Sequence, residues 1–99
     1  MKDRLWLTLT IGIIPVRVYL CEMNDDEDGW YKNDVIRINK NLSKEERFST
    51  LVHECIHCIL NQYGWQEIIE KTDIPEEPLV MALEHGIIQM LGPFLRRPK

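Results

Sequence analysis

Residues 43–64 read SKEERFSTLVHECIHCILNQYG, and this stretch decides the fold. Ser43, followed three residues later by Glu46, is the capping-box pattern with which many helices begin. Apolar side chains then recur at helical spacing, and Gly64 supplies the left-handed residue that commonly follows a helix. The pattern therefore predicts a helix from Ser43 to about Tyr63.

The polar face of this helix carries a metal-binding pattern. Residues four apart on a helix project from the same side, so His53 and His57 can direct imidazole nitrogens at one metal ion. Glu54 lies about a quarter-turn to the side, near a metal-bound water rather than on the metal, as a general base requires. Apolar residues occupy the opposite side of the helix. We therefore predict a zinc site in which Glu54 is the catalytic residue.

A catalytic zinc site needs a third protein ligand and one open position. Residues 73–91 predict a second helix that Gly92 and Pro93 end. Glu77 and Glu84 are seven residues apart and lie at one margin of its apolar face. The geometry of a helix therefore allows either carboxylate to be the third ligand.

The residues before the first helix predict a small sheet. Residues 5–11 and 16–21 alternate apolar and polar side chains, as two strands of a hairpin would, and residues 35–39 form a third, β-branched run. Residues 24–29 are an acidic, turn-forming loop. The expected fold is α+β: an antiparallel N-terminal sheet of about three strands, then an active-site helix and a C-terminal glutamate helix. Residues 65–71 fit a short helix or an ordered loop.

Size and composition limit the class of protein. A chain of 99 residues predicts one domain over 1–99, and 44% hydrophobic with 28% charged residues is typical of a soluble globular protein. The net charge of -4 argues against a nucleic-acid partner. Cys55 and Cys58 fall within one predicted helix, and the total of three cysteines is odd, which favours a reducing compartment. We expect a cytoplasmic protein with no membrane span, acting on a peptide or protein.

The order of these features resembles the gluzincin-like minimal metallopeptidases, which include the minigluzincins and many small proteins encoded by phages. In that family the third zinc ligand is a glutamate that opens the second helix, in a pattern like Glu-x-x-Val-x-x-Leu-x-x-Gly. Glu77, Val80, Leu83 and Gly86 match this pattern, so the resemblance favours Glu77 over Glu84. The chain departs from the pattern at Pro78, which biases Glu77 towards the N-cap rather than the helix itself.

The sequence leaves function classes open. The first is a zinc-dependent metallopeptidase that hydrolyses peptide bonds through a metal-bound water activated by Glu54. The alternative is a catalytically inactive module that keeps zinc for stability and binds or regulates a partner. A metal-free interaction domain is a third class, and zinc content distinguishes it from the other two.

Overall fold

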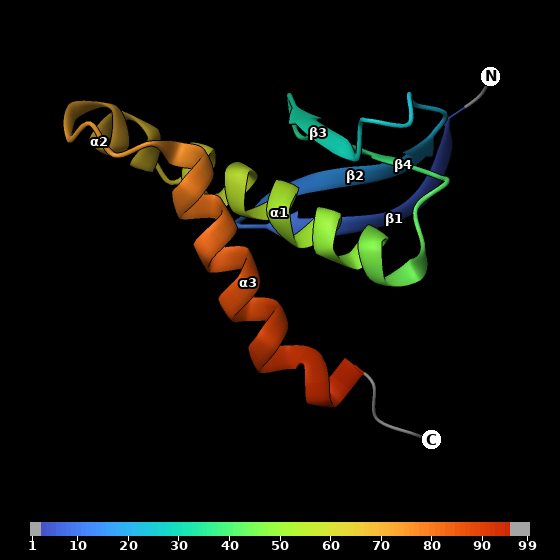
Figure 1. Cartoon of the computed structure of the whole chain (residues 1–99). Helices are drawn as coiled ribbons and strands as arrows, with labels where there is room; N and C mark the ends of the chain where they lie inside the picture. Colours follow the sequence, from blue (N-terminus) through green and yellow to red (C-terminus); the bar gives the residue numbers. More distant parts are fainter. Residues whose placement is uncertain (1–2, 96–99) are drawn as a thin grey trace.

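The computed structural model describes residues 3–95 as a sheet followed by helices (Figure 1). The elements in chain order are β1 (Arg4–Ile11), β2 (Ile14–Cys21), β3 (Gly29–Lys32), β4 (Val35–Asn39), α1 (Lys44–Gln62), α2 (Trp65–Lys71) and α3 (Glu76–Leu95). The expected α+β class, with the sheet first and the helices after it, is confirmed. Residues 65–71 form a short helix. No helix in the described part of the chain combines the length and apolar character needed to cross a membrane.

The sheet has four strands in the order β1-β2-β4-β3, and it is mixed rather than antiparallel throughout. β1 pairs with β2 and β3 pairs with β4 in antiparallel fashion, whereas β2 and β4 are parallel. The expectation of about three antiparallel strands missed β3. After β2 the chain crosses to the outer edge, forms β3 and turns back, so β4 enters between β2 and β3 in the same direction as β2.

A two-residue turn joins β3 to β4. Asn33 and Asp34 have φ angles of 51° and 62°, the left-handed values that a type I′ hairpin turn requires at both central positions. Asparagine and aspartate tolerate these values better than most residues. This turn fixes the register in which Lys32 faces Val35.

The apolar core lies between α1 and one face of the sheet. Val16, Val18, Ile36 and Ile38 alternate with outward-facing residues along β2 and β4, and each is 0% exposed. Because these four β-branched side chains are completely removed from water, the two central strands supply much of the hydrophobic stabilisation.

Helix α1 begins and ends as its sequence predicts. The Glu46 amide donates to the Ser43 hydroxyl at 3.2 Å, and the Ser43 amide donates to the Glu46 carboxylate at 2.9 Å, which completes the capping box. Gly64 has a φ of 77° and redirects the chain into α2. The two ends of α1 are therefore fixed, and they determine the position of the two histidines in the middle of the helix.

Helix α3 packs across α1, and its C-terminal half extends away from the sheet (Figure 1). It continues through Gly92 and Pro93 to Leu95, so the expected end before Gly92 was wrong. A proline lacks the amide that would bond to the carbonyl four residues earlier, but in the last turn of a helix this costs a single hydrogen bond. Several apolar side chains of α3 remain exposed, among them Met81, Leu83 and Met90.

Candidate metal centre

The N-terminal end of α3 meets the middle of α1 at the two histidines. Glu77 Oε1 lies 2.5 Å from His57 Nε2 and 3.3 Å from His53 Nε2. The three residues each offer one ligand atom, and these atoms all lie within 4.8 Å of one another. Two imidazole nitrogens and one carboxylate oxygen therefore converge on one point between the helices.

The donor set suits zinc in both chemistry and spacing. Zinc is bound by histidine nitrogen and carboxylate oxygen at about 2.0–2.2 Å, and a tetrahedral arrangement then places neighbouring ligand atoms about 3.3 Å apart. The separation of 3.3 Å between His53 Nε2 and Glu77 Oε1 matches this value. The shorter contact, between His57 Nε2 and Glu77 Oε1, is a hydrogen bond. A shift of less than ~1 Å in the exposed Glu77 side chain would lengthen it to the spacing of two zinc ligands.

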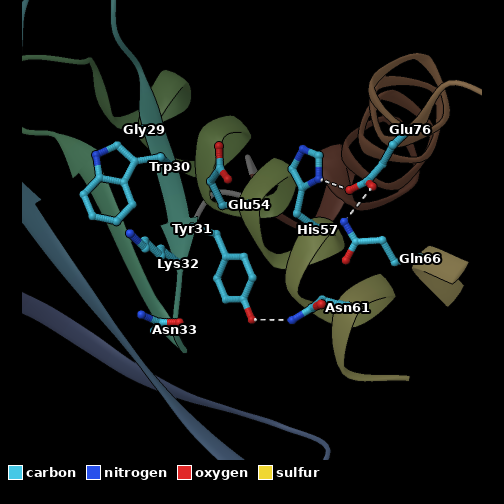
Figure 2. Close-up of a pocket in the computed structure, with 10 residues that line it drawn as sticks. All are labelled: Gly29, Trp30, Tyr31, Lys32, Asn33, Glu54, His57, Asn61, Gln66 and Glu76. Atoms are coloured by element: carbon cyan, nitrogen blue, oxygen red, sulfur yellow. Dashed lines mark hydrogen bonds and ion pairs between the residues drawn. The ribbon is translucent and has the colours of Figure 1, made fainter. Parts of the chain in front are cut away.

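Carboxylates of α3 also form hydrogen bonds with Nδ1, the other nitrogen of each imidazole ring. His53 Nδ1 lies 2.8 Å from Glu84 Oε1, and His57 Nδ1 lies 2.6 Å from Glu76 Oε2. The Ser49 hydroxyl donates to Glu84 at 2.5 Å. A carboxylate at Nδ1 fixes the ring and its tautomer, so that Nε2 is free to bind a metal. Figure 2 shows the Glu76 carboxylate held between His57 and the amide of Gln66.

Glu77 and Glu84, the two carboxylates that sequence spacing left open, occupy different places. Glu77 reaches the Nε2 side of both histidines, whereas Glu84 lies at the Nδ1 side of His53. Burial raises the pKa of Glu84, but the hydrogen bonds from Ser49 and His53 outweigh it and leave the pKa below its usual range. Because α3 begins at Glu76, Glu77 is the second residue of the helix rather than its N-cap.

Glu54 lies beside the histidines in a largely buried position. Its side chain is 8% exposed, and no other described side chain or amide forms a hydrogen bond with its carboxylate. Burial raises the pKa of Glu54, while the neighbouring His57 and His53 oppose this shift. A carboxyl with a raised pKa is a better proton acceptor near neutral pH than an ordinary surface glutamate.

Two clefts share Glu54 in their walls; the first runs along β3, and the second reaches this strand at Gly29. The first cleft, of about 440 Å³, is lined by Gly29, Trp30, Tyr31, Lys32, Asn33, Glu54, His57, Asn61, Gln66 and Glu76 (Figure 2). The second cleft, of about 320 Å³, is lined by Asp28, Gly29, Ser49, Thr50, His53, Glu54, Glu77 and Glu84. Gly29 and Glu54 line both, so the two clefts form one groove past the histidines.

Gly29 lets β3 approach α1 closely at the centre of this groove. A Cβ atom at this position would lie 2.7 Å from the Arg37 carbonyl oxygen and 2.8 Å from Thr50 Cγ2. Both distances are shorter than real contacts of a Cβ atom, so a side chain would force β3 away from β4 and from α1.

Sequence reasoning did not assign several of the residues that surround the centre. The contacts of Glu76 with His57 and of Ser49 with Glu84 were not expected, and β3 was read as part of a loop. The aromatic pair Trp30-Tyr31, followed by a turn and then by Val35-Ile36, was the signal that could have revealed β3. The roles of Glu76 and Ser49 depend on how α3 crosses α1, which no local pattern encodes.

Two histidines one helical turn apart, a glutamate between them and a carboxylate from α3 define a centre of the zinc metallopeptidase type. The chain belongs to the IrrE N-terminal-like domain family, Peptidase M78, whose sequence profile matches residues 17–81. This range runs from β2 into the second turn of α3, so it includes His53, Glu54, His57 and Glu77. Comparisons with curated proteins and with solved structures returned no significant match.

Proposed function

We propose that this protein is a zinc-dependent peptidase in which His53, His57 and Glu77 hold the metal and Glu54 is the catalytic base. The convergence of both Nε2 atoms on Glu77 carries the proposal. The membership in a zinc metallopeptidase family supports it. A glutamate ligand near the start of a helix C-terminal to the motif helix, as Glu77 is in α3, is also the arrangement expected of a minimal, gluzincin-like peptidase.

Zinc, when bound, acidifies a water molecule and polarises the carbonyl of the scissile peptide bond. Glu54 accepts the proton of the attacking water and then transfers it to the departing amine, so that the carboxylate is regenerated. Its burial supports this role, because the groove shields the proton from bulk solvent. Glu76 and Glu84 keep the imidazole rings oriented throughout.

The free edge of β3 supports an extended peptide as the substrate. The Asn39 amide donates to the Asp28 carbonyl at 2.8 Å, and hydrogen-bonded pairs alternate along an antiparallel ladder. Gly29 and Tyr31 consequently belong to the pairs that direct their N–H and C=O groups away from β4. Because β3 is the edge strand, these groups are available to bind the backbone of a peptide in the groove.

A reducing, cytoplasmic setting is part of the proposal. Cys21, Cys55 and Cys58 are all free thiols, and two of them lie on the same helix. Burial raises the pKa of Cys55 to about 11, so its thiol stays protonated and takes no part in the chemistry of the centre.

Replacement of Glu54 by Gln tests the proposal. The amide keeps the size of the side chain but cannot accept the proton, so hydrolysis of a peptide library should fall by about 10²–10⁴-fold. Elemental analysis should still find bound zinc, because Glu54 is not a ligand. Glu70→Gln, an exposed residue of α2, is the matched control and should retain full activity.

Mass spectrometry of the digested library distinguishes the alternatives. Full activity of Glu54→Gln would contradict the proposed base. If the zinc-loaded protein cleaves nothing although it binds the metal, the catalytically inactive, zinc-stabilised module is the better description. If the protein binds no zinc, both the peptidase and the zinc-stabilised module are wrong.

A further inference from the structure

The two clefts differ in charge. The second cleft, at the Gly29 end of β3, contains the carboxylates of Asp28, Glu54, Glu77 and Glu84 and no lysine or arginine. These four carboxylates outnumber the two positive charges of a zinc ion. The first cleft, which runs along β3, contains Lys32 and several amide side chains beside the carboxylates of Glu54 and Glu76. A peptide that spans the groove therefore meets the more negative field on the Asp28 side of the centre.

Within the second cleft, three of the carboxylates already have a partner or a role at the centre. Glu77 contacts both histidines, Glu84 is bonded to His53 and Ser49, and Glu54 lies beside the proposed attacking water. Asp28 is exposed and lies at the outer end of the cleft, just before β3. Its charge is the one that remains for a ligand.

Thr50 adds a second, independent feature. It is 9% exposed, lines the second cleft, and its hydroxyl forms no hydrogen bond with any residue between 3 and 95. Because the Thr50 hydroxyl oxygen has no partner among these residues and is not fully enclosed, an N–H group that enters the cleft can donate to it. A carboxylate at the entrance and an acceptor at the wall together suit the ammonium of lysine or the guanidinium of arginine.

The direction of the peptide determines which of its residues enters this cleft. A strand that adds antiparallel to β3, the more stable pairing, runs from the Lys32 end towards the Gly29 end. The residues that follow the scissile bond then lie over the second cleft. The residues that precede it lie over the first.

We infer that the second cleft selects peptides with lysine or arginine directly after the scissile bond, and this inference rests on the proposed peptidase function. Asp28 is the residue that determines this specificity, and Thr50 assists it as a hydrogen-bond acceptor. The substrate class is a protein segment in which a basic residue follows the cleaved bond.

The test uses peptides that share one cleavable sequence and differ only after the scissile bond, where they carry lysine, norleucine or glutamate. The wild-type protein should prefer lysine over norleucine by about tenfold in kcat/KM. Asp28→Asn should remove most of this preference, and Asp28→Lys should favour glutamate. Thr50→Val, which keeps the shape of the side chain, should lower the lysine preference by a few-fold.

Asp25→Asn is the matched control, because it removes the same charge from the same loop but lines neither cleft of the groove. It should leave the lysine preference intact. An equal loss in Asp25→Asn and Asp28→Asn would overturn the assignment to Asp28. A preference for lysine before the scissile bond would overturn it as well.

Binding of the same peptides to the zinc-loaded Glu54→Gln variant, measured by fluorescence anisotropy, separates this inference from the proposed function. The lysine peptide should bind about tenfold more tightly than the norleucine peptide. Equal binding and equal cleavage would overturn the specificity and leave the peptidase in place. Tighter binding of the lysine peptide without any cleavage by the wild-type protein would support the acidic, cation-binding cleft and reject the peptidase.

Discussion

The molecule has two packing regions, one on each side of α1, and they consist of different kinds of side chain. Between α1 and the sheet lie aliphatic side chains such as Val18 and Ile36, which are 0% exposed. Between α1 and α3 the central contacts are those of histidines with carboxylates, supported on α3 by Val80, which is also 0% exposed. Met81, Leu83 and Met90 of α3 are exposed, whereas Leu79, Ile87, Ile88 and Leu91 are partly buried.

The difference indicates that the two regions have different tasks. Apolar burial between α1 and the sheet is sufficient to position the motif helix with or without a metal. The contact between α1 and α3 depends on charged groups, whose interaction changes when a cation binds among them. The first region should therefore fix the scaffold, and the second should respond to the metal.

The largest effect on stability should come from a substitution that leaves a cavity between α1 and the sheet. Ile36→Ala should lower the free energy of unfolding by about 2–5 kcal/mol, because Ile36 is completely buried among the strands and α1. The loss should be similar in the zinc-loaded and chelated protein, as measured by urea denaturation. Met81→Ala, which truncates an apolar residue of α3 that is 47% exposed, should change stability by less than about 1 kcal/mol. Equal losses in both variants would break the distinction between the regions.

A smaller and more selective effect should follow a change in the second region. Glu84→Gln keeps the size of the side chain but weakens its hold on His53 Nδ1, so zinc affinity should fall by about 10–100-fold. Competition with a chromophoric chelator measures this affinity. Hydrogen exchange should rise in α3 and stay low in β2 and β4 when zinc is removed. Unchanged zinc affinity, or a loss of the same size in the control Glu70→Gln, would contradict the proposed role.

The smallest effect concerns the face of the sheet away from α1, where Arg37 Nε donates to Asp3 at 2.9 Å. This hydrogen bond, with a smaller contribution from Cys21, lowers the pKa of Asp3. The stabilisation is fully present above about pH 4, the pKa of an unfolded aspartate, and is lost as the pH falls through the lower folded value.

Urea midpoints of the wild-type protein and Asp3→Asn should therefore differ slightly at pH 6 and converge near pH 2. The pair is exposed, so the difference at neutral pH should be modest and should shrink in high salt. Asp25→Asn should show no such convergence. A gap that stays constant down to pH 2 would show that the ionised carboxylate of Asp3 is not its source.

Features that depend on neighbouring residues could be predicted from the sequence. The capping box at Ser43 and the left-handed Gly64 act within a few residues, and both occur as expected. The spacing of His53 and His57 likewise guarantees that they share a helix face. In each case the helix itself supplies the geometry, so the pattern is sufficient.

Features that depend on the path of the chain could not be predicted in the same way. β3 has only four residues beside an acidic loop, and the parallel pairing of β2 with β4 follows from the crossing that precedes it. The places of Glu76 and Glu84 depend on the angle and offset at which α3 meets α1. Thr50 and Glu54 are buried although they lie on the polar side of α1, because β3 and α3 cover that side.

The close approach at Gly29 has a consequence for anyone who wishes to alter this protein. Because Gly29 has no side chain, β3 and α1 lie close together, and their separation sets the width of the groove beside Glu54. An alanine there would push β3 away from Arg37 and Thr50, and would so move the edge proposed to bind the peptide without replacing any imidazole or carboxylate. The alignment of the proposed substrate with Glu54 thus depends on a position that carries no functional group.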